Sequence, residues 1–351
     1  MRYQKWLAAL LLALLAVFPC LALADMKVSF LNEGGTALIE ADGQYMLVGA
    51  FGGSDVDKLL SYVSSLGVSK IDLAAATGWD EENAGGLAAV SAQLEIASLW
   101  LPEGMTTGNP PANIQAKTPL TGDILDLGGA KITAWTIAGS YTPSLMLRVD
   151  YGARSFLFVP AVGEDSALPF NQSEAGAHAD VVIAKAPVPQ TLWDAATPLF
   201  AVSAGGSGAA GTADSLTDSS ILTLQPGTDR IITFITDGTA LKAEYEAVGV
   251  TVEGSVNLRK EPTTKAGRAA TLTKGTVLNI TGAQAAPEGL WFAVTADGKA
   301  GFVRGDLIRE ITAEEAETLL SQATHKPPKS TNENPAPNDD GTGEEAPPDC
   351  H

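Results

Sequence analysis

Histidine and cysteine, the residues that build most zinc and redox sites, are nearly absent from this chain. Three histidines occur in 351 residues, and His325 and His351 lie in or beside the C-terminal tail. His178 is therefore the single histidine available to a folded domain, which excludes a histidine-rich binuclear metal centre. The two cysteines, Cys20 and Cys350, lie close to opposite ends of the sequence, which excludes a disulfide within the folded part.

Positive charge is the second shortage. The chain carries 22 Lys and Arg against 41 Asp and Glu, and its formal net charge is −19. Such an acidic protein repels polyphosphates at long range, whereas nucleic-acid binding depends on clustered Lys and Arg that meet phosphates. We therefore expect no nucleic-acid partner.

Residues 1–24 have the pattern of a secretory signal peptide. Arg2 and Lys5 precede the apolar run Trp6–Phe18, and Ala22-Leu23-Ala24 forms a cleavage site. Cleavage removes two positive charges and no negative one, so the formal charge changes from −19 to −21. The predicted location is extracellular, either secreted or at the cell surface.

Two alternatives stay open for this N-terminal segment. In a lipoprotein Cys20 would carry the lipid, although Pro19 stands where a small residue is expected. The segment could also be kept as an anchor, although its apolar run is short for a membrane span. No later segment is long and apolar enough to cross a membrane, so no span is expected after signal cleavage.

Strand and helix patterns alternate along the first third of the chain. Short apolar runs predict strands at 27–31, 37–40, 45–48, 71–76 and 97–101. A helix is predicted to end at Gly67, and its buried side is expected to hold Val56, Leu59, Leu60, Val63 and Leu66. A second helix is predicted at 87–94. This alternation is typical of the α/β class, in which helices cover the faces of a sheet.

The middle of the chain is richer in strand patterns. Segments 123–129 and 131–137 predict one hairpin, and residues 144–159 predict a second that turns at Gly152. Further strands are predicted at 181–185, 199–203 and 231–236, with a short helix at 192–196.

The stretch Asp72–Leu87, DLAAATGWDEENAGGL, is the candidate site. Its apolar strand ends at Thr77-Gly78, and the polar loop Trp79–Asn83 leads to a helix that begins after Gly85-Gly86. In α/β sheets, ligands usually bind at loops of this kind, at the carboxyl end of a strand.

This frame resembles the central motif of the metallo-β-lactamase fold, strand–T-H-x-H-x-D-H–x-G-G–helix. The resemblance is strongest to the extracellular domain of competence-type DNA-uptake channel proteins. Residues 144–159, SLMLRVDYGARSFLFV, are similar to the S-L-V-L-R-L-x-Y-G-x-x-S-F-L-L-T-G-D segment of that family. The resemblance implies an αββα sandwich of the α/β class over residues 26–245. In that family the site holds zinc ions that activate a bridging water.

The residues that would bind zinc are replaced throughout. Where the family has metal ligands, this chain has Gly49, Gly78, Asp80, Glu82, Asn83, Pro160-Ala161 and Ala186-Pro187-Val188-Pro189. The resemblance therefore implies a metallo-β-lactamase-like domain without its metal ligands. We expect no cofactor, although zinc is typical of the family.

The acidic loop allows three interpretations. Asp80, Glu81 and Glu82 stand just before a helix N-terminus, where the macrodipole favours negative charge. Asp80 and Glu82 are also candidate ligands of a weak calcium or magnesium site, because hard cations take oxygen ligands. The third interpretation is a binding site for another ligand, formed by Trp79, Asp80, Glu81 and Asn83.

Residues 249–310 predict a small all-β barrel. Short strand patterns punctuated by glycine include VNLRKEP from Val256, LWFAV from Leu290 and GFV from Gly301. They resemble the bacterial SH3-type domain, with Phe302 where tryptophan is usual. Trp291 and Phe302 are its candidate binding residues, although aromatic side chains more often fill the core of a small barrel.

The C-terminal end carries no further domain pattern. Residues 311–324 predict a short helix. Residues 325–351 are rich in Pro, Asn, Asp and Glu with almost nothing apolar, which predicts a disordered acidic tail.

Three functional hypotheses follow. The first is a secreted, non-catalytic cell-surface binding protein whose SH3-type domain contacts cell-wall peptidoglycan or a surface protein, as the resemblance implies. The second is a metallo-hydrolase of the same fold with a site rebuilt around Asp80 and Glu82. The third is a structural partner that docks on a membrane protein or on an active relative.

Overall fold

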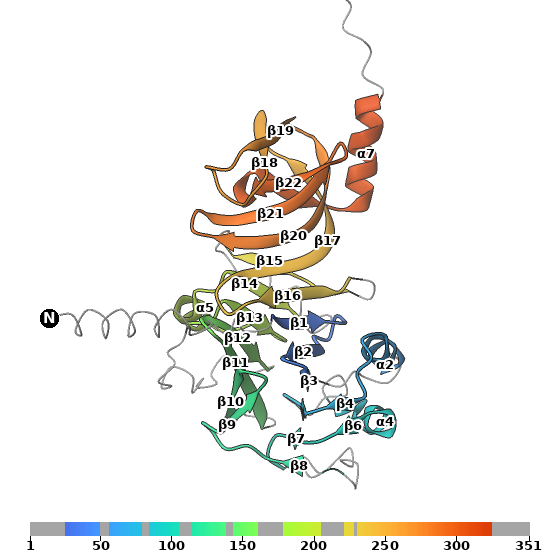
Figure 1. Cartoon of the computed structure of the whole chain (residues 1–351), viewed down its shortest axis with the longest axis vertical. Coiled ribbons are helices and arrows are strands. Elements are labelled where there is room, and N and C mark those ends of the chain that lie inside the picture. Colours follow the sequence, from blue (N-terminus) through green and yellow to red (C-terminus); the bar gives the residue numbers. More distant parts are fainter. Residues whose placement is uncertain are drawn as a thin grey trace, which may run out of the picture.

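Two mixed β-sheets that pack against each other form the larger part of the fold (Figure 1). The computed structural model describes residues 25–49, 56–78, 84–104, 114, 116–137, 143–160, 178–204, 221–227 and 230–324. The first sheet has the strands β1 (Met26–Phe30), β2 (Ala37–Ala41), β3 (Gln44–Val48), β5 (Leu73–Ala75), β7 (Leu99–Trp100), β8 (Ala116–Lys117) and β16 (Ile232–Thr236). Its order is β16-β1-β2-β3-β5-β7-β8, antiparallel up to β3 and parallel beyond it.

The second sheet has seven strands and the same mixed character. Its strands are β9 (Ile124–Leu127), β10 (Ala130–Ile137), β11 (Ser144–Tyr151), β12 (Arg154–Val159), β13 (Val181–Ala184), β14 (Phe200–Ser203) and β15 (Leu222–Leu224). They follow one another in chain order, antiparallel from β9 to β12 and parallel from β12 to β15. The two predicted hairpins and the turn at Gly152 are confirmed.

Helices cover the outer faces of the two sheets, as the alternating pattern predicts. The helices α2 (Val56–Ser65) and α4 (Leu87–Gln93) pack on the first sheet, and α5 (Gln190–Ala196) packs on the second. The side chains of one strand divide between layers: Leu38 contacts the helical layer, whereas Ile39 enters the core between the sheets. Four layers result, helix, sheet, sheet and helix. We call strands β1 to β16 with these helices the two-sheet region.

Three sequence expectations for this region are wrong in detail. The strand expected at 71–76 is split into β4 (Lys70–Ile71) and β5, because the Asp72 carboxylate accepts a hydrogen bond from the Tyr45 amide (3.0 Å) between them. The short strand β4 pairs with β6 (Glu95–Ile96), and the strand expected at 97–101 is shortened to β7 at Leu99–Trp100. Leu66, expected on the buried side of the first helix, is 44% exposed because α2 already ends at Ser65.

The turns at one end of the two sheets touch each other. Gly152, with φ +59°, lies so close to the turn between β16 and β17 (Leu241–Thr251) that an added Cβ would stand 2.6 Å from the Cα of Gly238. The amide of Ala153 donates to the Gly238 carbonyl at 2.7 Å. A side chain at position 152 would therefore separate the two sheets or distort both turns.

The C-terminal module continues the first sheet (Figure 1). We give this name to β18 (Ser255–Arg259), β19 (Arg268–Thr273), β20 (Val277–Ala286), β21 (Gly289–Ala296), β22 (Lys299–Arg304) and β23 (Ile308–Ile311). A turn of 3-10 helix, Gly305–Leu307, lies between β22 and β23. The pairing order is β19-β18-β22-β21-β20-β17, and β23 pairs with β17. Across residues 230–324, all of which are described, no ladder joins β19 to β23, so strand pairing leaves the expected barrel open.

Strand β17 (Leu241–Thr251) belongs to both parts of the molecule. Its first half pairs with β16, its second half pairs with β23, and β20 runs beside both halves across a bulge at Glu244–Ala247. The boundary expected between residues 245 and 249 therefore falls inside one continuous strand. This strand was not predicted from the sequence.

The described chain ends in the helix α7 (Ala313–Thr324), at the place where a short helix is expected. The helix lies along the C-terminal module, next to β17 and β20 (Figure 1). None of the helices in the described part of the chain has the length and apolarity that crossing a bilayer requires. The predicted signal peptide, residues 1–24, and the predicted tail, residues 325–351, lie outside the described residues.

Candidate functional site

The carboxyl ends of the parallel strands meet at one rim of the two-sheet region. The amide of Leu145, at the start of β11, donates to the Thr77 carbonyl just after β5 (2.9 Å), which joins the two sheets there. Gly35 and Ala204 are in contact across the same rim. This rim is where the sequence places the ligand site, because β5 leads into the loop that begins at Gly78.

The rim carries small and apolar residues at the positions where the resemblance places metal ligands. Gly49 follows β3, Gly78 follows the strand end, Pro160 follows β12 and Ala186 follows β13. None of these side chains offers a nitrogen, oxygen or sulfur atom to a metal. The described residues contain no group of three or more His, Cys, Asp or Glu that could hold a metal ion. The described part of the rim does not fit a zinc site.

Five of the predicted site residues lie in one segment that the structure does not describe. Trp79, Asp80, Glu81, Glu82 and Asn83 fall in the gap between Gly78 and Ala84. The cation site and the ligand site suggested for this loop therefore stay predictions.

His178 stands at the opposite end of the second sheet, before β13. Its Nδ1 lies 3.0 Å from the Ala196 carbonyl oxygen, and its Nε2 lies 3.8 Å from Asp180. The buried Asp180 carboxylate accepts from the Ser155 amide (2.9 Å) and from Arg154 (2.8 Å). These contacts bind β12, β13 and the end of α5 together, and Ser155 is itself buried. The group stabilises the fold and presents no exposed nucleophile.

Trp291 and Phe302, the aromatic candidates of the C-terminal module, lie on one face of its sheet. Trp291 is opposite Arg304 and Phe302 is opposite Ala293, so the two aromatic residues are diagonal neighbours on β21 and β22. Trp291 is 2% exposed, and its indole N–H has no hydrogen-bond partner among the described residues. Phe302 is half-buried. Of the two, Phe302 is the one that a ligand can reach.

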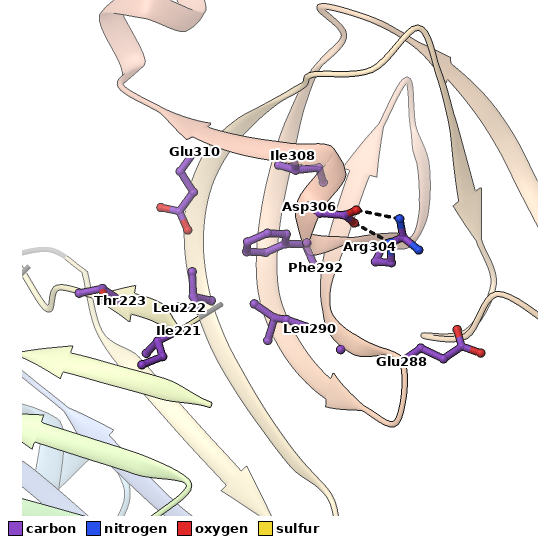
Figure 2. A pocket seen from close by; sticks show the side chains of 12 residues that line it. Ile221, Leu222, Thr223, Glu288, Leu290, Phe292, Arg304, Asp306, Ile308 and Glu310 are labelled. Carbon is purple, nitrogen blue, oxygen red and sulfur yellow. Dashed lines mark hydrogen bonds and ion pairs between the residues drawn. The ribbon is translucent and has the colours of Figure 1, made fainter. Parts of the chain in front are cut away.

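A cavity of about 650 Å³ lies between β15 and the C-terminal module (Figure 2). Ile221, Leu222 and Thr223 line one side of it. The other side consists of residues from the β20–β21 turn, β21 and the segment from Arg304 to Glu310. Its volume is within the range of ligand-binding cavities. The lining residues are Ile221, Leu222, Thr223, Glu288, Gly289, Leu290, Phe292, Arg304, Gly305, Asp306, Ile308 and Glu310.

Hydrogen bonds hold the acidic side chains of this cavity in place. Arg304 donates to both carboxylate oxygens of Asp306 (2.5 and 2.7 Å), and this contact raises the pKa of the guanidinium. Hydrogen bonds from the amide and hydroxyl of Thr264 lower the pKa of the Glu288 carboxyl. Of the four charged side chains that line the cavity, three are carboxylates (Glu288, Asp306 and Glu310) and one is the Arg304 guanidinium.

Glu310 connects the cavity to the buried junction of the two parts. It accepts a hydrogen bond from the Tyr245 hydroxyl (3.0 Å). The pKa of that phenol is raised, mainly because the hydroxyl is buried and also because the negative charge of Glu310 lies beside it. Arg230 stacks over the Tyr245 ring, with its guanidinium carbon 4.9 Å from the ring centre. Its Nη2 lies 3.5 Å from Glu310, an ion pair rather than a hydrogen bond.

The cavity was missed from the sequence because β15 was missed. The run Ile221-Leu222-Thr223-Leu224 stands between Ser219-Ser220 and Pro226-Gly227, which is the pattern of a short strand between turn residues. That signal predicts the strand. The position of the strand beside residues 60 or more positions later in the chain has no local sequence signal.

Comparison with known proteins gives one family match and several structural likenesses. Residues 254–309 match the family described as Bacterial SH3 domain. No curated protein sequence matches the chain. The metallo-beta-lactamase fold protein YhfI from Bacillus subtilis is similar in structure, with 11% identity and a TM-score of 0.45 over 61% of this chain and 100% of that one.

Two further structures are similar at the same low level. A diphosphatase from the PhnP family has 11% identity and a TM-score of 0.45, over 61% of this chain and 98% of that one. A metallo-beta-lactamase from Cronobacter sakazakii has 15% identity and a TM-score of 0.33 over 39% of this chain. The present chain spans 56% of the length of the Cronobacter enzyme.

Proposed function

We propose that this chain is a secreted, non-catalytic binding protein with a metallo-β-lactamase-like two-sheet region, and that its C-terminal module contacts cell-wall peptidoglycan. The observation that carries the proposal is the composition of the rim. Gly49, Gly78, Pro160 and Ala186 stand where the resemblance places metal ligands. Hydrolysis in that family depends on a metal-bound water of lowered pKa, and these side chains cannot hold the metal.

The match of residues 254–309 to a bacterial SH3 domain supports the wall contact. Domains of this class bind wall components or protein segments, and the inference from that class to this chain is an analogy of fold. Phe302 is the aromatic residue of the module that is half-buried rather than enclosed. We assign it to the wall-binding face.

The test is co-sedimentation of the mature protein, residues 25–351, with purified insoluble peptidoglycan. We expect the protein to sediment with the wall and Phe302→Ala to remain mostly in solution. Arg309→Ala, on the exposed part of β23, is the matched control and should sediment like the wild type. Thermal melting of both variants verifies that they are folded. Failure of the wild type to sediment with walls from several bacteria would overturn the wall contact.

Measurements of metal content and hydrolytic activity distinguish the proposed binding protein from the alternative, a metallo-hydrolase with a rebuilt site. After dialysis against zinc, manganese and calcium, elemental mass spectrometry should find almost no bound metal, and phosphodiester and lactam substrates should stay intact. Binding of about one metal equivalent per chain, lost in Asp80→Ala together with hydrolysis, would place the rebuilt site first.

A further inference from the structure

Strand β15 ends the second sheet with one side of its backbone unpaired by any described strand. It pairs with β14 alone, and the amide of Leu222 donates to the Leu199 carbonyl at 3.2 Å. Successive residues of a strand direct their backbone groups to opposite sides. The amide and carbonyl of Thr223 therefore point away from β14, and Thr223 lines the cavity. An extended chain can add to such an edge through its main-chain hydrogen bonds.

The cavity offers apolar surface next to this free edge. Leu222 faces it from β15, and Leu290, Phe292 and Ile308 line it from the module (Figure 2). Leu222 and Leu290 are half-buried, so part of their surface is available to a bound side chain. An occupant with apolar side chains at alternate positions would bury that surface, since alternate residues of an extended chain share one face.

The charges of the lining select the occupant. Asp306 is neutralised by Arg304, whereas Glu288 accepts hydrogen bonds from Thr263 and Thr264 and forms no ion pair among the described residues. Glu310 accepts a hydrogen bond from the Tyr245 hydroxyl, and its one ion pair among the described residues is the 3.5 Å contact with Arg230. The acidic C-terminal tail of the chain itself is therefore repelled, and a positively charged segment is attracted.

We propose that this cavity binds an extended, lysine- or arginine-bearing segment of another protein, which adds as a strand to β15 at Thr223. The bound segment lies between the two-sheet region and the C-terminal module. Its apolar side chains contact Leu222, Leu290 and Phe292, and its basic side chains approach Glu288 and Glu310. This site differs from the wall-binding face in its aromatic contact, because Phe292 and Phe302 project from opposite faces of the same sheet; Arg304, which also lines the cavity, lies on the Phe302 face.

The first experiment measures fluorescence anisotropy with the full mature chain and two labelled peptides, Val-Lys-Val-Thr-Val-Lys-Val and its twin with Glu in place of Lys. We expect the lysine peptide to bind and the glutamate peptide to bind at least about tenfold more weakly. The affinity of the lysine peptide should fall as salt is raised, because exposed charges are screened. Equal binding of the two peptides, or binding of neither, overturns the proposal.

The second experiment tests the strand edge. Thr223→Pro removes the free amide while the Leu222 amide keeps its bond to β14, and prolines are tolerated on such an edge. This variant should bind the lysine peptide about tenfold more weakly, whereas the matched control Thr223→Val, which keeps the amide, should stay within about twofold of the wild type. Undiminished binding by a folded Thr223→Pro chain overturns strand addition.

The third experiment tests the charge without disturbing the edge. Glu288→Gln keeps one acceptor oxygen for the Thr264 amide, can donate from its NH2 group to a threonine hydroxyl, and removes the charge, so the affinity should fall about threefold to tenfold and lose part of its salt dependence. Glu317→Gln, the same change on the exposed surface of α7, is the control and should have no effect. A soluble peptidoglycan stem peptide is added as competitor. Displacement of the lysine peptide at equal concentration would identify the cavity as a wall site and overturn the protein-segment proposal.

Discussion

Strands in the two parts of this molecule use their faces differently. Seven of the eight residues of β11 are buried, whereas one of the six residues of β19 is. In the two-sheet region, strands such as β11 and β13 have the other sheet on one face and α5 on the opposite face. In the C-terminal module, β18, β19 and β22 have only one or two buried residues each.

We infer from this difference that the two-sheet region contributes most of the stability, whereas the C-terminal module offers the surface for ligand binding. Burial of both faces gives the two-sheet region most of its apolar contact, and it leaves little strand surface free for a ligand. Fewer strand residues are buried in the module, and its aromatic residue Phe302 is only half-buried. The proposed wall contact therefore lies where packing uses the least of the surface.

The largest effect is expected at Phe234, in the core of the two-sheet region. It is fully buried, and its ring centre is 5.3 to 6.0 Å from those of Phe200, Phe156 and Phe30. Phe234→Ala should lower the free energy of unfolding by about 3–5 kcal/mol, measured by chemical denaturation. Phe302→Ala in the module should lower the free energy of unfolding by clearly less than Phe234→Ala does. Equal losses would mean that the two parts do not differ in packing.

The next largest effect is expected at Gly249, in the second half of β17. It is buried, and an added Cβ would stand 2.9 Å from Ile308 and 3.0 Å from Ile280. Gly249→Val should therefore cost about 1–3 kcal/mol through overpacking of the module. Hydrogen exchange should accelerate in β20 to β23 and stay slow in β10 to β13. Equal acceleration in both would show that the two parts open as one unit.

A smaller, pH-dependent effect is expected at Asp237, in the turn between β16 and β17. Its carboxylate accepts hydrogen bonds from the amides of Thr239 (2.8 Å) and Ala240 (2.7 Å), which lower its pKa. The stabilisation is present above the unfolded-state pKa of about 3.9 and is lost as the pH falls through the lower folded-state pKa. Asp237→Ala should therefore cost about 1 kcal/mol at pH 7 and progressively less below pH 4. Chemical denaturation of the wild type and the variant at pH 7 and below pH 4 measures this. The same difference in free energy of unfolding at both pH values would contradict the prediction.

The smallest effect is expected for the exposed ion pair of the module. Arg309 donates to both oxygens of Glu315 and links β23 to α7, but the two side chains are 55% and 40% exposed. Arg309→Ala should change the free energy of unfolding by less than about 1 kcal/mol, because solvent screens such pairs. A larger loss in thermal melting would show that α7 is a structural part of the module.

The elements that sequence reasoning found are those whose signal is local. The hairpin that turns at Gly152 was predicted because a turn residue separates two long apolar runs. The helix over Val56–Ser65 was predicted because its apolar residues recur at helical spacing. Leu66 was misplaced because that spacing continues one residue beyond Ser65, the last residue of α2.

The elements that were missed depend on contacts between distant residues. Strand β17 reads LKAEYEAVGVT, in which Lys242, Glu244 and Glu246 alternate with apolar residues, a local pattern that predicts a strand, but its pairing with β16, β20 and β23 joins residues far apart in the sequence. Asp72 divides a strand because it caps the amide of Tyr45, 27 residues earlier. The rim was predicted from the strand–loop–helix pattern, but its acidic loop lies outside the described residues. The cavity beside Thr223 was not predicted, because no spacing in the sequence relates β15 to Glu288 or Glu310.

The continuous strand β17 has a mechanical consequence. A flexible linker between two domains is stretched by tension before force reaches either domain. Strand β17 is already extended and joins the two parts directly, so it cannot lengthen in this way. Tension applied along the chain while the module holds an insoluble polymer would load the ladders of β17 with β16 and β20 in shear, many hydrogen bonds at once. The spacing between the anchored face and the two-sheet region is then fixed, and a partner seated beside β15 would be held at a constant height above the anchoring surface.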